Sequence, residues 1–476
     1  MATVTTTPQP QMIPGPHALP LLGWRMNLLK VYLKPFTYLP WLHRTYGNIV
    51  ALAQDHPHHI CVFGPEMNFR VLANPDLFGT SAAPLVKLPK DTALGRLFYH
   101  GLPLQNGERH RQHRRLMQPA FHKKQIAQYH ADMALLTQQM LDQWQARATA
   151  GATLDVLTEI KQLTQRIAVK TLFGMDDQAE IERIGGLLQA LKIAPLALAL
   201  PLNVPGSPYH RVLRLAKQME AFTHALITKK RLQPEATDVL SVLVHTHDED
   251  GAQLSDDELM SNIFTLFVAG HETTSHTLTW TLFLLDQHPR ICSDLLDELE
   301  GTAHGSVPTP EQLMRLSLLD NVIKESLRLL PPASIGVRVT TTACDLGGYP
   351  LPAAASVLYS EYVTHRLPEL YEHPSCFMPA RWGTINRTPY EYLPFSAGHH
   401  RCIGAEFATY EMKIVLAMLL QRYRLSLIPN TKVSTNIGMR PSPGIPMQIF
   451  PQDRQFRQPP TVRGTIHRLV DIQRSW

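Results

Sequence analysis

A long helix signal begins at Ser255 and sets the scale of the fold. Residues 255–258 read SDDE, the pattern of a capping box, in which the serine hydroxyl caps the first turn and the glutamate reaches back to it. An apolar pattern then continues from Leu259 to about Leu285, which corresponds to about 40 Å at 1.5 Å per residue. A helix of this length crosses a whole domain, so we expect the other elements to pack around it.

The rest of the chain also indicates a mainly helical protein. With 476 residues, of which 44% are hydrophobic and 18% charged, the chain can bury a large core, and disorder is not expected. Strand-like runs occur within 47–74 and 334–360, but no repeat and no linker divides the chain. We therefore predict one domain over 21–452 that is mainly α with small β-sheets (α+β). A tail with a proline-rich end (1–20) would precede it, and a polar tail (453–476) would follow it.

Composition argues against several kinds of partner. The formal net charge of +5 is small for this length and gives no reason to expect nucleic acid. The five cysteines are scattered without a CxxC pair, so neither a disulfide framework nor a zinc ribbon is expected, and a reducing compartment fits. The N-terminus lacks a charged start followed by an apolar run, and no stretch reaches about twenty apolar residues. We expect a soluble, cytoplasmic protein without a transmembrane anchor.

The stretch AGHETTSH, residues 269–276, places poorly suited residues inside the long helix. Gly270 costs about 1 kcal/mol relative to alanine, and threonine hydroxyls bond back to carbonyls one turn earlier and bend a helix. One interpretation is a partly exposed segment. The other is an opened groove beside a cofactor, in which Glu272 and Thr273 deliver protons. The residues alone leave the two interpretations equally supported.

Two further helical motifs carry charge. Glu325 and Arg328 in KESLRLLPP lie three residues apart, so an ion pair on one helical face is expected. Its apolar flanks indicate partial burial, which such a pair tolerates only with further hydrogen bonds. His110 and Arg114 lie four residues apart in GERHRQHRRLMQPAF, residues 107–121, beside three more arginines. That segment is either a solvated basic face or a clamp for carboxylates or an acidic partner.

Cys402 lies within FSAGHHRCIG, residues 395–404, just before a strongly helical run. A helix N-terminus and the basic residues 399–401 favour a thiolate, and Gly398 and Gly404 permit a tight turn against a flat group. An isolated cysteine is more often an inert buried thiol. A zinc site would need more ligands nearby, and a cysteine nucleophile would need an oriented base and an oxyanion loop. A thiolate bound to haem iron fits all these features together.

Three motifs in order resemble those of the cytochrome P-450 superfamily. FSAGHHRCIG resembles its haem-binding signature F-x-x-G-x-[RH]-x-C-x-G, ESLR its ExxR pair, and AGHETT its oxygen-activation motif. Residues 365–382 resemble the meander before the cysteine, although PARW stands where PERF is commoner. The resemblance covers most of residues 14–450. It implies the cytochrome P-450 fold, with haem between the long central helix and the cysteine-ligand loop and helix.

The resemblance implies a role for each matching residue. Cys402 would be the axial ligand of the haem iron, and Phe395 would shield its sulfur. Glu272 and Thr273 would relay protons to dioxygen. Residues of the haem pocket would include Ala269 and Gly404. The haem propionates would be bound by four cationic groups: His110, Arg114, Arg338 and His400. The meander would be held by a structural network: Glu325, Arg328 and Arg381.

The implied activity is a monooxygenase that contains haem b (iron protoporphyrin IX) and inserts one atom of O2 into a small molecule. No flavin or iron–sulfur segment fits in the chain, so we expect electrons from NAD(P)H to arrive through a ferredoxin or flavodoxin with its reductase. The basic segment 109–124 and the Cys402 loop would be the docking face for this acidic partner.

The expected wall of the substrate pocket contains no lysine or arginine, which favours a neutral, lipophilic substrate such as a terpenoid, steroid or fatty acyl compound. The residues expected to form that wall are Thr265, Val268, Ala269, Ser334, Ile335, Ile437 and Met439.

Other functions of a haem protein stay open at this point. A peroxide-driven hydroxylase and a haem-dependent isomerase or dehydratase would share the fold. Neither needs protons delivered to dioxygen, so the Glu272–Thr273 pair argues against both. A non-enzymatic haem sensor is the remaining alternative.

Overall fold

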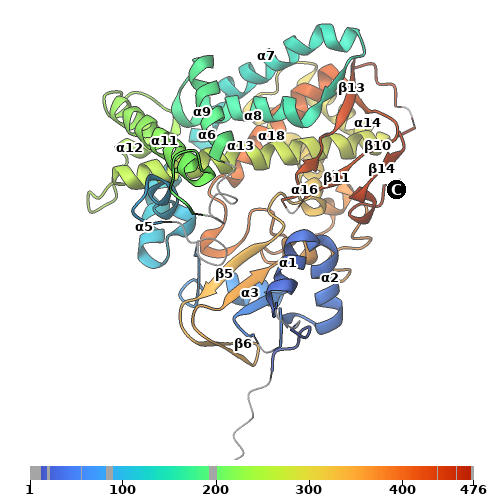
Figure 1. The fold of residues 1–476 in the computed structure, drawn as a ribbon. Coiled ribbons are helices and arrows are strands. Elements are labelled where there is room, and N and C mark those ends of the chain that lie inside the picture. Colours follow the sequence, from blue (N-terminus) through green and yellow to red (C-terminus); the bar gives the residue numbers. More distant parts are fainter. Residues whose placement is uncertain are drawn as a thin grey trace, which may run out of the picture.

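The computed structural model describes residues 12–18, 22–54, 56–81, 89–191, 201–436, 438–456 and 458–472 (Figure 1). Most of this described chain is helical, as the sequence predicts. Its helices in the first half are α1 (Arg25–Leu33), α2 (Pro35–Tyr46), α3 (Pro65–Leu72), α4 (Ala93–Tyr99), α5 (Gly107–Met117), α6 (Lys123–Gln128), α7 (His130–Thr149), α8 (Val156–Phe173), α9 (Gln178–Leu191) and α11 (Pro208–Arg231). Those in the second half are α12 (Val239–His245), α13 (Asp256–Gln287), α14 (Pro289–Ala303), α15 (Pro310–Arg315), α16 (Ser317–Leu329), α17 (Glu361–Thr364) and α18 (Ala405–Arg422).

The strands are short and fall into small, separate sheets. The largest sheet has the order β1-β2-β8-β5-β3. Its strands are β1 (Ile49–Ala51), β2 (His59–Val62), β3 (Phe78–Gly79), β5 (Gly336–Thr340) and β8 (Ser356–Tyr359). A second sheet, β4-β13-β9, consists of β4 (Thr153–Asp155), β9 (Tyr423–Leu427) and β13 (Pro446–Pro451). Three two-stranded pairs complete the set: β6 (Cys344–Leu346) with β7 (Tyr349–Leu351), β10 (Thr431–Lys432) with β14 (Val462–Arg463), and β11 (Ser434–Thr435) with β12 (Pro441–Ser442).

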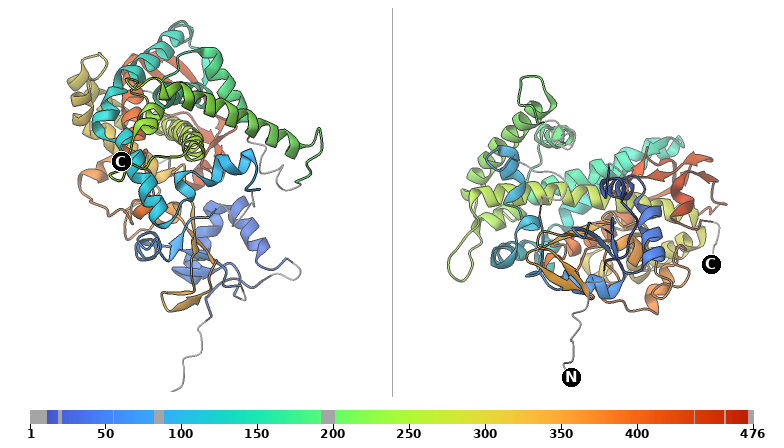
Figure 2. Two further views of the ribbon diagram at one scale, coloured as in Figure 1. Left: turned by 90° about the vertical axis from the view of Figure 1, so that its left-hand side faces the viewer. Right: turned by 60° about the horizontal axis from the view of Figure 1, so that its bottom comes forward.

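Helix α13 is the predicted long helix, and it crosses the molecule (Figure 1). The capping box is present: the Ser255 hydroxyl accepts from the Glu258 N–H, and the Glu258 carboxylate accepts from the Ser255 N–H at 2.8 Å. The helix ends two residues beyond the predicted Leu285. From Thr277 to Leu285 every side chain is buried, because α13 is packed between α8 and α16 (Figure 2, left). A helix enclosed in this way is a rigid support for any site on its surface.

The five-stranded sheet joins two distant parts of the sequence. Strand β2 pairs in parallel with β8, and β8 pairs with β5, so residues 49–62 lie beside residues 336–359 (Figure 1). This sheet has its own small core, which is separate from the helical core around α13. The pairing brings β5, which carries Arg338, next to the helical part of the molecule.

The two predicted tails are partly packed. Near the N-terminus, Ile13 is buried, and the carbonyl of Pro14 accepts from the N–H of Ala51 at 2.9 Å. Near the C-terminus, Ile466, Leu469 and Val470 are buried. The polar tail predicted over 453–476 therefore differs from the structure, in which β14 and these apolar residues cover the end of the helical core. No helix in the described ranges is long and apolar enough to cross a membrane.

Candidate functional site

A cavity of about 340 Å³ lies between α13 and the turn that precedes α18. Its wall is predominantly apolar, and it brings together residues from segments far apart in the sequence. Leu102, His110 and Arg114 come from the chain between α4 and the end of α5, and Arg338 comes from β5. The residues of segment 395–404 close the opposite side. The cavity therefore brings together three segments singled out in the sequence, 107–121, 269–276 and 395–404.

Cys402 lies in this wall, on a turn held by backbone hydrogen bonds. Its N–H donates to the carbonyl of Phe395 at 2.8 Å, which folds the loop back on itself. Cys402 has accessible surface and lines the cavity, and desolvation by the surrounding protein raises the pKa of its thiol. The N–H of Gly404 and the charges of Arg114 and Arg401 act in the opposite direction and favour the thiolate.

The two glycines beside Cys402 serve different purposes. Gly398 has a positive φ of 67°, and a Cβ there would lie 2.0 Å from the carbonyl oxygen of Leu72 at the end of α3. Close approach of α3 therefore requires this glycine. Gly404 lines the cavity, and a Cβ there would meet no atom of the described chain within 4 Å. Space for a flat group exists at Gly404 and not at Gly398.

The opposite wall is formed by one face of α13. Ala269 and Thr273 are exposed in the middle of this otherwise buried helix, because both face the cavity. The hydroxyl of Thr273 donates to the carbonyl of Ala269 at 2.7 Å. This is the back-bonding expected of threonine within a helix. The structure places Ala269 and Thr273 against an internal cavity, as the second interpretation of AGHETTSH requires, and the delivery of protons by this segment stays a prediction.

Glu272 is placed differently from its neighbour Thr273. It is not part of the cavity wall, and its carboxylate lies 3.3 Å from the ammonium group of Lys161 on α8. The two side chains are about one quarter exposed. The carboxylate of Glu272 is therefore partly exposed to solvent, while the next residue, Thr273, faces the cavity.

Four basic side chains line the cavity together: His110, Arg114, Arg338 and His400. The rings of His110 and His400 are 4.0 Å apart between centroids. Burial, and then the surrounding positive charges, lower the pKa of His110 to about 4 and that of His400 to about 3. None of the four forms an ion pair with a carboxylate of the described residues. The two guanidinium groups therefore make this part of the cavity suited to bind an anion, and each neutral imidazole can donate one hydrogen bond to it.

Glu325 and Arg328 form a fully buried ion pair next to the meander. Arg328 binds both carboxylate oxygens of Glu325, at 2.8 and 2.9 Å, and donates to three carbonyl groups, those of His365, Pro374 and Cys376. Burial alone would raise the pKa of Glu325, but the neighbouring arginines lower it below the usual value. A buried pair with this many additional hydrogen bonds is the kind that a protein tolerates.

Three more groups donate to the same carboxylate. They are the N–H of Met378, Nε of Arg381 and Nε1 of Trp382, each at 3.0 Å. Trp382 belongs to the PARW sequence that departs from the family pattern. Its indole N–H adds a donor to Glu325 in a network that has no glutamate at position 380.

The structure adds two polar residues to the cavity that the sequence motifs did not indicate. Glu411 on α18 is fully buried, lines the cavity and has no hydrogen-bond partner for Oε1 in the described chain. Burial raises its pKa well above the usual value and so favours the neutral form. The sequence could have predicted that Glu411 faces the cavity. It lies on the same helical face as three cavity residues, which are Gly404, Phe407 and Ala408. The second residue, Asn262 on α13, lies on the face that carries Ala269 and Thr273.

Only part of the predicted substrate wall lines the cavity. Thr265 and Ala269 do so, and Ile437 lies outside the described residues. The other predicted wall residues lie elsewhere: Val268, Ser334, Ile335 and Met439. The backbone carbonyls of Ser334 and Met439 accept from Ser360 and Trp280, respectively, within the core. Which side of an irregular segment faces the cavity depends on such tertiary contacts.

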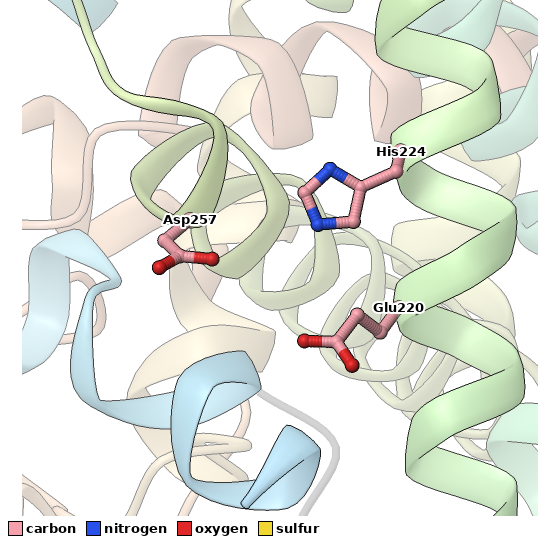
Figure 3. Close-up of side chains that lie close together, drawn as sticks. All are labelled: Glu220, His224 and Asp257. Carbon is pink, nitrogen blue, oxygen red and sulfur yellow. The ribbon is translucent and has the colours of Figure 1, made fainter. Parts of the chain in front are cut away.

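A separate cluster of potential metal ligands lies where α11 meets the start of α13 (Figure 3). Glu220, His224 and Asp257 point toward one another, with ligand atoms within 4.8 Å. All three are partly exposed, and Arg96 on α4 already binds Glu220 at 2.6 Å. The cluster is thus a charged contact that joins α4, α11 and α13 above the cavity.

The cavity fits the haem that the resemblance implies. Such a group is flat and carries two carboxylates, and the cavity has an open wall at Gly404 and two arginines, Arg114 and Arg338, without a carboxylate partner among the described residues. Cys402 faces the same space, and a thiolate is a known axial ligand of haem iron. The residues that would hold the group are Cys402, His110, Arg114, Arg338 and His400.

Comparison with known proteins gives a consistent result. The chain matches the family model for Cytochrome P450 over residues 13–447. It is 33% identical to cyclooctat-9-en-7-ol 5-monooxygenase of Streptomyces melanosporofaciens, over 88% of this chain and 90% of the relative. It is 30% identical to the putative cytochrome P450 139 of Mycobacterium tuberculosis, over 86% of this chain and 96% of the relative.

A solved structure is also similar. The retinoic acid-bound cyanobacterial CYP120A1 superposes with a TM-score of 0.77 at 25% sequence identity, covering 93% of this chain and all of that one. The fold, the turn that carries Cys402 and the similar proteins all indicate the same family. The chain belongs to the cytochrome P450 family, and it is a haem-dependent oxidoreductase of the monooxygenase type that requires O2 and electrons from a partner protein.

Proposed function

We propose that this chain inserts one oxygen atom into a lipophilic small molecule of the terpenoid, steroid or fatty acyl class. The observation that carries the proposal is the cavity, which has Cys402 on one wall, Ala269 and Thr273 on the other, and a mainly apolar surface between them. Apolar pockets with few polar groups are typical of sites for lipophilic ligands. One similar protein is named for a cyclooctatenol and another was solved with retinoic acid, and both names fit this class.

The residues of the chain would divide the work as follows. Cys402 would bind the haem iron, and the two arginines and two histidines of the cavity wall would bind the haem carboxylates. When bound, the haem supplies the activation of O2, to which a thiolate ligand contributes electron density. Thr273 would donate protons from its hydroxyl into the cavity. Glu272, held at the surface by Lys161, would collect those protons from solvent.

We further propose that electrons come from NAD(P)H through an acidic ferredoxin or flavodoxin and its reductase, in the cytoplasm. In the basic segment 109–124, Arg109 and Arg111 are paired with Glu258 and Glu108, whereas Lys123 and Lys124 are exposed on α6, which packs against α18. Exposed charges attract a partner of opposite sign most strongly at low ionic strength. Reduction of the haem by such a partner should slow as salt is added, and a rate that does not depend on salt would contradict this docking face.

The decisive experiment is a difference spectrum of the haem-loaded protein in its reduced, carbon monoxide-bound form. A red-shifted Soret band would report thiolate ligation, and Cys402→His should abolish that band while haem is still retained. Turnover of terpenoid probes under ¹⁸O2 with an electron supply should then place one labelled oxygen in the product. Turnover with peroxide alone would instead favour the peroxide-driven alternative.

A further inference from the structure

Asn262 lies in the cavity wall about three turns before Thr273 on α13. Its side chain is fully buried, and its Oδ1 accepts the N–H of Leu102 at 2.7 Å. A backbone N–H can only donate, so this bond decides the orientation of the amide. The NH2 group therefore points away from Leu102. It has no hydrogen-bond partner in the described part of the chain.

Thr265 follows one turn later on the same face. Thr273, Thr274 and Thr277 each donate to the carbonyl four residues earlier. Thr265 forms no such bond within the described residues, although it has the same helical setting. Gly101 packs so closely that a Cβ there would lie 2.9 Å from the Thr265 hydroxyl oxygen. One unpartnered donor and one hydroxyl thus lie one turn apart on the face of α13 that lines the cavity.

The amide donor of Asn262 is costly to leave unsatisfied. A buried donor without a partner costs about 1–3 kcal/mol, and native proteins rarely keep one without a ligand or a bound water. The nearby wall at this end, formed by Leu102, Pro103 and Leu266, is apolar and offers no side-chain acceptor. A ligand that enters the cavity is therefore the natural source of the missing oxygen atom.

We propose that Asn262 and Thr265 bind the single polar oxygen of an otherwise apolar substrate. The oxygen belongs to a hydroxyl or carbonyl group: it accepts from Asn262, and Thr265 pairs with it as donor or acceptor. The inference rests on the proposed function and narrows its substrate class to lipophiles that already carry one oxygen function.

Asn262 and Thr265 together form a polar anchor for the substrate. The position of this anchor along α13 also determines which part of the substrate is oxidised. Asn262 and Thr273 are eleven residues apart, which is about 16 Å along a helix. Since Thr273 lies where oxygen is delivered, the anchored end of the substrate is held away from the reacting carbon. The new oxygen is introduced in the half of the molecule remote from the existing one.

The test uses the haem-loaded full chain and two probes of the same skeleton, geranylgeraniol and the hydrocarbon that lacks its hydroxyl group. Binding is measured from the substrate-induced shift of the Soret band. The wild type should bind the alcohol at least about tenfold more tightly than the hydrocarbon, which corresponds to about 1.4 kcal/mol. Asn262→Leu should remove this preference and leave hydrocarbon binding within about twofold. Thr265→Val, which keeps the side-chain shape, should reduce the preference to an intermediate value.

Ser261→Ala provides the matched control. The Ser261 hydroxyl donates to the carbonyl of Leu97 at 2.8 Å, so this variant also removes a bond between α13 and the α4 region but leaves the cavity groups intact. It should keep the full preference for the alcohol. If Ser261→Ala loses the preference as Asn262→Leu does, the effect comes from packing and the proposed contact is refuted.

Two further outcomes would overturn the anchor. Equal affinity of the wild type for both probes would mean that a buried water satisfies Asn262. Oxidation of geranylgeraniol next to its own hydroxyl group would place the polar end at the reacting side. Neither outcome affects the proposed monooxygenase activity. That activity is tested separately, by the carbon monoxide difference spectrum and by labelled oxygen in the product.

Discussion

The buried carboxylate of Glu325 gives the sharpest test of how this fold holds its cysteine turn. Glu325→Gln keeps the size of the side chain but removes its charge and replaces one acceptor oxygen with an NH2 donor. Five donated hydrogen bonds converge on the native carboxylate, three of them from Arg328 and Arg381. The variant leaves both arginines buried without a counter-charge.

The cost can be approximated from the contacts. Breaking a buried ion pair by removing one partner costs about 3–5 kcal/mol. For a chain of 476 residues the entropy of unfolding is about 1 kcal/mol per degree, so the loss corresponds to a fall in Tm of about 3–5 °C. The meander that Arg328 and Arg381 hold leads directly to the Cys402 turn, so we also expect a smaller fraction of the protein to retain haem.

Thermal unfolding followed by circular dichroism, together with the ratio of haem to protein, measures both effects. Glu66→Gln is the matched control, because Glu66 forms an exposed ion pair with Arg70 at 2.8 Å, and such pairs contribute little. Trp382→Phe removes one donor to Glu325 and should give an intermediate loss. If Glu325→Gln melts within about 1 °C of the Glu66→Gln control, the structural role argued for this network is wrong.

Two further predictions concern single side chains. Thr273→Ala should keep reductant consumption but lower the yield of oxygenated product and raise peroxide release, because the hydroxyl that faces the cavity is lost. Thr279→Ala removes a similar helical back-bond away from the cavity and should leave the product yield unchanged. Burial raises the pKa of Glu361 from 4.5 to about 8, so the stability that is fully present below pH 4.5 is lost progressively as pH rises to about 8. Glu361→Gln cannot ionise and should melt above the wild type at pH 8 but equally at pH 4.5. A difference in Tm that does not change with pH would contradict this assignment.

Local sequence signals predicted the parts of the molecule that depend on neighbouring residues. The capping box and apolar period marked α13 to within two residues, because both signals act within a few turns of one helix. The pairing of Glu325 with Arg328 follows from helical spacing in the same way. The motif order around Cys402 indicated the family, and the structural comparison agrees with it.

Contacts between distant segments were decided only by the tertiary structure. Gly398 is required by the carbonyl of Leu72, which lies more than three hundred residues earlier in the chain. The packing of Ile466 and Leu469 against the core was not evident in a polar C-terminal sequence. The amide of Asn262 is oriented by Leu102, a contact that no helical pattern encodes. Sequence periodicity determines which face a helix buries, whereas the unpaired groups on that face depend on what the rest of the chain places against it.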